Sequence, residues 1–269
     1  MAVEMGIIAP HAPSMIFEDQ APEYQKEAIQ GMKTVAKIID EINPDVALLV
    51  SCHWMTTFDH YVDASEYHKG KCTSPENPAL IHKVPYSYPG DRELGVKLAE
   101  AGQKAGIPVV ELNDPEYDWD YGTLVPLRYL IPKENIPVIN MPVVMCSTLD
   151  ECYLWGQVIR DVVEQMGRKA IMIASGALSH NLVRGREIMP TLAEQAMNNQ
   201  FVSLLEKGDL DTAWNMLPQF GHLAKVESGG RHLATLLGFL KGGSYDYGYY
   251  GFCQSSASGN VVVTLRRKS

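Results

Sequence analysis

The feature that most constrains the fold is a set of short segments that are apolar at successive positions. Residues 45–51 (DVALLVS) and 169–174 (KAIMIA) are the clearest, and residues 6–9 (GIIA) form a shorter one. A strand with one solvated face alternates apolar and polar residues, whereas a strand covered on both faces is apolar throughout. These segments therefore predict buried strands, of the kind found in parallel sheets that have helices on both sides.

Helical segments alternate with these strands. In residues 21–42, apolar side chains recur at intervals of three and four, and the pattern stops before Asn43 and Pro44. The alternation predicts an α/β fold, with a single domain over residues 1–269 and a central covered, largely parallel β-sheet flanked by helices. We predict a loop at residues 242–251, which are rich in glycine and tyrosine. The further predicted helices are 92–104, 149–166, 192–205, 210–216 and 231–240, and the further predicted strands are 109–112, 136–141 and 261–265.

Composition argues against several classes of function. The sequence has 32 acidic and 23 basic residues, which give a formal net charge of −9. Because phosphate contacts need a basic surface, this charge argues against a nucleic-acid-binding protein. No apolar run approaches the roughly 18 residues of a membrane span, and no signal sequence is recognisable. The five cysteines are irregularly spaced without a CxxC pair, which predicts neither a disulfide framework nor a zinc knuckle. We therefore expect a cytoplasmic protein with no nucleic-acid and no membrane partner.

Three histidines follow predicted strands closely. His11 comes after residues 6–9, His53 after residues 45–51, and His180 a short turn after residues 169–174. Because the carboxyl ends of parallel strands meet at one edge of a sheet, we expect these histidines on one rim. Histidine is the commonest metal ligand and the usual acid or base near neutral pH. The other histidines lack this placement and are expected mainly at the surface or behind the site: His60, His68, His82, His222 and His232.

Two histidines and one carboxylate make the facial triad that holds Fe(II) in oxygenases and leaves positions open for substrate and O₂. His11 and His53 could supply the imidazoles. The residues alone do not select the carboxylate, although Glu227 precedes small residues, 228–230 (SGG), which allow close approach to the backbone. The acidic candidates are Glu227, Asp59, Asp114, Glu116, Asp118 and Asp120. Other catalytic motifs (HExxH, GxxxxGKS/T, GxSxG) do not occur in the sequence.

Five segments together carry a resemblance to a known family. They are residues 10–15 (PHAPSM), 52–54 (CHW), 121–129 (YGTLVPLRY), 174–180 (ASGALSH) and 227–230 (ESGG). In this order, over about residues 5–265, the chain resembles the class III extradiol ring-cleavage dioxygenases, the superfamily of the protocatechuate 4,5-dioxygenase β subunit.

The resemblance implies a cofactor, a site and a reaction. Fe(II) would be held by His11, His53 and Glu227, and His180 would be the active-site histidine that handles protons and oxygen. Tyr121 would donate a hydrogen bond in the substrate pocket. The expected reaction uses O₂ to open a catecholic small molecule beside its two hydroxyls, which gives a semialdehyde. The enzyme is expected to be a homo-oligomer.

The resemblance also implies a substrate like 3,4-dihydroxyphenylacetate. A second hypothesis is a 2-aminophenol or protocatechuate-type dioxygenase of the same fold. Two further hypotheses are a non-catalytic paralogue that binds partners and a metal-dependent hydrolase. Three basic residues could meet a substrate carboxylate, although each is expected to be solvated at the surface: Arg128, Lys83 and His232.

Overall fold

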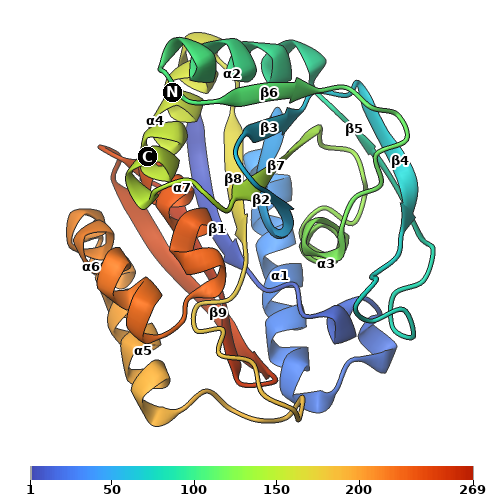
Figure 1. Ribbon diagram of the computed structural model, residues 1–269, viewed down its shortest axis with the longest axis vertical. Coiled ribbons are helices and arrows are strands. Elements are labelled where there is room, and N and C mark those ends of the chain that lie inside the picture. Colours follow the sequence, from blue (N-terminus) through green and yellow to red (C-terminus); the bar gives the residue numbers. More distant parts are fainter. Residues whose placement is uncertain (1, 269) are drawn as a thin grey trace.

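The computed structural model describes residues 2–268 and has a six-stranded sheet at its centre (Figure 1). The strand order is β7-β2-β8-β1-β10-β9. Strands β7, β2, β8 and β1 are parallel, and β10 runs antiparallel to both β1 and β9. The predicted α/β fold with a covered, largely parallel sheet is therefore confirmed. The six strands are β1 (Val3–Ala9), β2 (Val46–Thr56), β7 (Val138–Val144), β8 (Ala170–Ser175), β9 (Tyr245–Ser255) and β10 (Ser258–Arg267).

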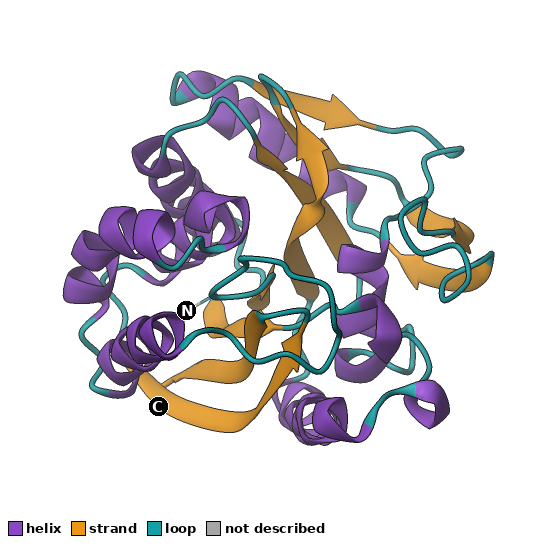
Figure 2. Ribbon diagram, turned by 60° about the horizontal axis from the view of Figure 1, so that its bottom comes forward, coloured by secondary structure: helices purple, strands orange, loops and turns teal. Residues whose placement is uncertain are grey.

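Helices cover both faces of this sheet (Figures 1 and 2). On β2, Val46, Leu48 and Val50 pack into a core with α2, α4 and α7, whereas Ala47 and Leu49 belong to a second core with α1 and α3. Both faces bury side chains, which explains why the segment is apolar at successive positions. The α-helices are α1 (Glu23–Ile42), α2 (Arg92–Lys104), α3 (Tyr121–Leu130), α4 (Leu149–Gln165), α5 (Leu192–Glu206), α6 (Leu210–Leu223) and α7 (Arg231–Leu240), and the 3₁₀ helices are η1 (Pro13–Met15), η2 (Glu18–Gln20) and η3 (Glu227–Gly230).

Two small sheets complete the fold. Strands β3 and β6 pair in parallel, and β4 and β5 pair antiparallel. Of these four strands the sequence predicted β6 alone. The loop between β4 and β5, residues 73–83, carries Glu76 to Tyr121 at the start of α3. The strands are β3 (His60–Asp63), β4 (Tyr67–Cys72), β5 (Val84–Pro89) and β6 (Val109–Leu112).

The predicted loop at residues 242–251 is wrong. Most of this segment belongs to β9 (Tyr245–Ser255), which pairs with β10 along its whole length and packs against α1. Tyrosine has a high strand propensity and glycine a low one, and the pairing with β10 decides between them. None of the helices between residues 2 and 268 combines the length and the apolar composition that a bilayer crossing needs.

Candidate metal centre

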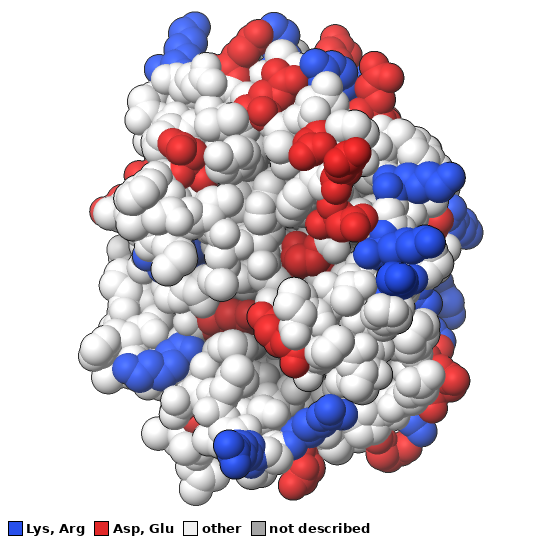
Figure 3. Space-filling view, turned by 45° about the vertical axis from the view of Figure 1, so that its right-hand side comes forward, with Lys and Arg blue, Asp and Glu red and all other residues white. Residues whose placement is uncertain are grey.

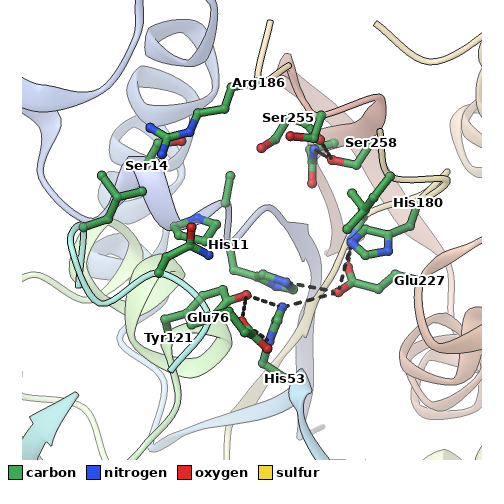
Figure 4. Close-up of a pocket in the computed structure, with 18 residues that line it drawn as sticks. His11, Ser14, His53, Glu76, Tyr121, His180, Arg186, Glu227, Ser255 and Ser258 are labelled. Atoms are coloured by element: carbon green, nitrogen blue, oxygen red, sulfur yellow. Dashed lines mark hydrogen bonds and ion pairs between the residues drawn. The ribbon is translucent and has the colours of Figure 1, made fainter. Parts of the chain in front are cut away.

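Four side chains from separate parts of the chain meet at the carboxyl ends of the parallel strands (Figure 4). His11 follows β1, His53 lies near the end of β2, His180 follows β8, and Glu227 begins η3. The three histidines thus lie on one rim, as the strand pattern predicted. Pro10 helps to end β1 before His11, because proline has no N–H group for the sheet.

Glu227 is the centre of the cluster. Its Oε1 atom lies 3.2 Å from His11 Nε2, 3.8 Å from His180 Nε2 and 3.9 Å from His53 Nε2. One potential ligand atom each from His11, His53 and Glu227 lies within 4.8 Å of the other two. Two imidazoles and a carboxylate this close together can hold a divalent cation.

The backbone around η3 fixes the Glu227 carboxylate. Ala177 N–H donates to Oε2 at 2.6 Å, and Glu227 N–H donates to the Leu178 carbonyl at 3.2 Å. After Glu227 the chain turns through Ser228, Gly229 and Gly230, all with positive φ, and the glycines adopt this conformation at little cost. Burial alone would raise the pKa of Glu227, but the nearby histidines, His11 first, lower that pKa well below its usual range. The site therefore favours an ionised carboxylate.

A hydrogen-bond chain orients His11. The Ser175 hydroxyl donates to the Gly122 carbonyl, so it accepts from His11 Nδ1–H, 3.0 Å away. This leaves Nε2 as the nitrogen that can offer a lone pair to a cation. Burial by itself lowers the pKa of His11, but the Glu227 carboxylate outweighs it, and the pKa is raised.

His53 contacts the first residue of α3. Its Nε2 lies 2.7 Å from the Tyr121 hydroxyl, which donates to Glu76 Oε2 at 2.8 Å. Burial and then the neighbouring His11 lower the pKa of His53 to about 4, which favours neutral imidazole. Burial and the Glu76 carboxylate raise the pKa of Tyr121 far above its usual range, so its hydroxyl stays protonated.

Helix α3 brings Tyr121 into place. The Asp120 carboxylate caps this helix at Thr123 N–H and accepts a hydrogen bond from Ser51 Oγ on β2 at 2.7 Å. At Gly122 a Cβ would lie 2.6 Å from Ser51 Oγ and 3.0 Å from His53 Cβ, so a side chain there would force α3 away from β2.

Helix α5 holds the segment that ends in His180. Asn198 Oδ1 accepts from Ser179 N–H at 3.1 Å, and Asn198 Nδ2 donates to Ser179 Oγ at 2.8 Å. His180 N–H in turn donates to the Lys225 carbonyl at 2.9 Å. His180 remains partly exposed at the cavity while the residue before it is buried.

A cavity of about 470 Å³ opens from the cluster. Two charged lining residues, Glu76 and Arg186, were not among the predicted site residues. Both lie on loops without a recognisable motif, and closeness in sequence to His180 was the one available signal for Arg186. On the face shown in Figure 3, acidic side chains lie in the central hollow. The lining residues are His11, Ala12, Pro13, Ser14, His53, Glu76, Asn77, Leu80, Tyr121, Ala177, His180, Leu182, Arg186, Glu227, Ser255, Ser256, Ser258 and Asn260.

Of the six acidic candidates, Glu227 alone joins the metal-ligand cluster found among residues 2–268. Asp120 caps α3, and Asp118 accepts from Lys71 N–H at 3.0 Å. Asp114 and Glu116 are exposed. Asp59 lines a separate surface pocket. The sequence could not separate these residues because the distinction depends on how distant segments pack.

None of the three basic residues that could have met a substrate carboxylate lines the cavity, namely Arg128, Lys83 and His232. Arg128 lies over the Phe17 ring, and Lys83 is exposed, as expected, just before β5. His232 is buried behind the cavity wall, where a Cβ at Gly176 would lie 2.6 Å from its Nε2.

His60 and His68 are also buried, not at the surface. His60 Nε2 lies 3.0 Å from Glu151 Oε1. His68 contacts the Val138 carbonyl through Nε2 at 2.9 Å and Asp63 Oδ2 through Nδ1 at 3.1 Å. These partners make both histidines parts of the structural core, away from the cavity.

Comparisons with known proteins agree on one family. The family described as the catalytic LigB subunit of aromatic ring-opening dioxygenase matches residues 5–260. The chain is 28% identical to the 2-aminophenol 1,6-dioxygenase beta subunit of a Pseudomonas species, covering 83% of this chain and 81% of that protein. It is 27% identical to 3,4-dihydroxyphenylacetate 2,3-dioxygenase of Escherichia coli, covering 88% and 89%.

The fold also matches a solved structure. The crystal structure of the uncharacterized protein JW3007 from Escherichia coli K12 superposes with a TM-score of 0.71 at 17% identity. The match covers 97% of this chain and 99% of that one. At this identity the match supports the fold and no detail of the site.

Proposed function

Because the chain belongs to the family of the catalytic LigB subunit of aromatic ring-opening dioxygenase, and is accordingly a ring-cleavage dioxygenase, we propose that it opens catechol-type rings beside the two hydroxyls with Fe(II) and O₂. The catalytic domain would span residues 1–269, and the product would be a ring-opened semialdehyde. The observation that carries this proposal is the meeting of His11, His53 and Glu227 at the base of one cavity.

The three proposed ligands suit ferrous iron. The donor set is two imidazoles and one carboxylate, which is the set that non-haem oxygenases use for Fe(II). The pKa directions of Glu227 and His53 favour the unprotonated forms that a cation needs. Bound there, iron would supply a Lewis acid for the catechol oxygens and a path for electrons to O₂.

The remaining polar groups at the cavity have distinct proposed roles. His180 would accept a proton from a substrate hydroxyl and return it later, because its Nε2 lies 3.8 Å from Glu227 Oε1 and its ring faces the cavity. Tyr121 would act as a hydrogen-bond donor to the substrate by turning its hydroxyl away from Glu76, since its raised pKa keeps the hydroxyl protonated.

We propose a substrate like 3,4-dihydroxyphenylacetate. The E. coli relative named for that compound supports this choice, and a cavity of about 470 Å³ has room for a catechol ring with a substituent. A 2-aminophenol or protocatechuate-type substrate is the second candidate, and the Pseudomonas relative named for 2-aminophenol supports it. We also propose a cytoplasmic homo-oligomer. All five cysteines are free in the structure of residues 2–268, which suits a reducing compartment.

Oxygen consumption tests the reaction. The protein is loaded with Fe(II) without air, then mixed with a catechol and oxygenated buffer, and both O₂ uptake and a yellow semialdehyde are followed. The panel includes 3,4-dihydroxyphenylacetate, protocatechuate and 2-aminophenol. We expect stoichiometric uptake with at least one catechol. No uptake across the panel would favour a partner-binding protein, and hydrolysis with zinc without O₂ uptake would favour a hydrolase.

A further inference from the structure

Arg186 is the one lysine or arginine among the described residues that line the cavity. The two acidic lining residues, Glu76 and Glu227, have partners of their own: Glu76 accepts from Tyr121, and Glu227 contacts His11. In Figure 4 the Arg186 side chain is at the top of the view, and His53 is at the bottom. The cavity therefore has an anionic, histidine-rich region and a separate cationic residue.

The guanidinium of Arg186 makes no hydrogen bond or ion pair within residues 2–268, although it lies close enough to Tyr24 to offset part of the rise that burial causes in the pKa of that phenol. Two serine hydroxyls that line the same cavity bond to groups other than Arg186. Ser14 Oγ donates to Gln25 Oε1 at 2.8 Å, and Ser258 Oγ donates to the Ser255 carbonyl at 2.7 Å. An arginine in this state offers five N–H donors in a planar fork that matches a carboxylate.

The backbone that carries Arg186 is held in place. Ser256 N–H donates to the Arg186 carbonyl at 3.1 Å, and Ala257 N–H donates to the Ile188 carbonyl at 2.9 Å. Val183 N–H donates to the Ser256 carbonyl at 3.0 Å. These bonds tie residues 183–188 to the turn between β9 and β10. Arg186 is thus presented at the cavity by a fixed loop, which reduces the entropy lost when it binds a ligand.

We propose that Arg186 determines substrate specificity by binding a carboxylate substituent on the aromatic ring. The proposal rests on the ring-cleavage function proposed above. A substrate bound this way has its carboxylate at Arg186 and its two hydroxyls at the His11, His53 and Glu227 cluster. Ring substrates with a carboxylate side chain are then preferred over uncharged catechols and over 2-aminophenol, which has no group for the guanidinium.

Steady-state kinetics of Arg186→Gln test this assignment. We expect the KM for 3,4-dihydroxyphenylacetate to rise about tenfold or more, while the KM for 4-methylcatechol changes far less, because the lost contact is to a charged group. Arg186→Lys keeps the charge without the fork and should recover part of the loss. Higher salt should also raise the wild-type KM for the carboxylate substrate, since Arg186 is exposed.

Arg184→Gln is the matched control. Arg184 is an exposed arginine of the same loop that does not line the cavity, so its loss should leave both KM values unchanged. Equal losses for the two substrates in Arg186→Gln, or equal effects of the Arg184 and Arg186 changes, would overturn the assignment.

A binding measurement separates this proposal from the proposed reaction. Calorimetry with 4-hydroxyphenylacetate, which has the carboxylate but only one hydroxyl, needs no turnover. We expect Arg186→Gln to weaken this binding about tenfold, with Arg184→Gln unaffected. If no catechol is cleaved but this difference appears, the ring-cleavage proposal fails and the anion site stands. If catechols are cleaved and the difference is missing, the Arg186 assignment fails alone.

Discussion

The cavity has two kinds of wall, and they differ in how firmly they are built. At the strand ends, His11 and Glu227 are 5% and 6% exposed, and buried hydrogen bonds fix their orientation. On the loop side, Glu76 has 59% of its side chain exposed, and Arg186 is exposed as well. The difference teaches that the sheet positions the groups proposed for chemistry, while loops supply the groups that meet the rest of the substrate.

The largest expected effect comes from the buried wall. Glu227→Gln or His11→Ala should reduce metal affinity by more than about 10²-fold. Even substitution of a residue that only hydrogen-bonds to a metal ligand lowers the affinity about 10- to 100-fold. Elemental analysis after iron loading and desalting measures this, with Glu76→Gln as the control that keeps its iron. Near-stoichiometric iron in both variants would remove these two residues from the metal site and with them the contrast between the walls.

His180→Phe should keep the iron and lower kcat by about 10²-fold, the usual scale for loss of an acid or base. His180 is intermediate between the two walls in its burial, because it follows the core strand β8 but has 28% of its side chain exposed. Metal content and kcat are measured on the same preparation. Full turnover in this variant would rule out a proton-transfer role for His180.

Tyr121→Phe should lower kcat/KM by about tenfold, because it removes one hydrogen-bond donor at the cavity and leaves Glu76 without its phenol partner. Glu76→Gln tests the same contact from the exposed loop and should lower kcat/KM by less than about threefold. If Glu76→Gln lowers kcat/KM more than Tyr121→Phe does, the loop wall contributes more to the reaction than its exposure suggests.

The smallest effect is on the stability of the metal-free protein. The pKa of Glu227 is lowered from 4.5, so its stabilising contribution is present above that pH and is lost on acidification. The pKa of His11 is raised from 6.5, so its contribution is present below that pH and is lost as the pH rises. The buried pair should therefore stabilise most between about pH 4.5 and 6.5.

Thermal melts of the metal-free protein measure this effect. Between pH 6 and 8 the Tm should fall by about 2–4 °C, the change that corresponds to roughly 1 kcal/mol. In Glu227→Gln the same interval should give a flatter profile, because His11 then has no carboxylate beside it. An equally steep fall in that variant would show that groups elsewhere cause the pH dependence.

Strand pattern explains which parts of the fold and the site could be predicted. The continuous apolar segments locate the parallel strands, and their ends locate His11, His53 and His180. The same rule could not identify the carboxylate, because Glu227 is brought in by a turn of three positive-φ residues packed against residues 177–178. Glu76 and Arg186 are beyond such a rule altogether, since loop positions follow from tertiary contacts and not from periodicity.

Local propensity was the weaker guide elsewhere. The tyrosines and glycines of β9 gave no clean alternation, and pairing with β10 made the segment a strand. Helix α6 runs to Leu223, past the predicted end at residue 216, although it contains Pro218. In both places contacts with the rest of the molecule decide the structure.

The hydrogen bond from Ala177 N–H to Glu227 Oε2 distinguishes the two oxygens of this carboxylate, because Oε1 is the one that lies beside the three histidines. In the proposed site Glu227 would offer Oε1 to the cation, and His11 and His53 would each offer one nitrogen. A protein that supplies three donors would leave room beside the cation for other molecules to bind.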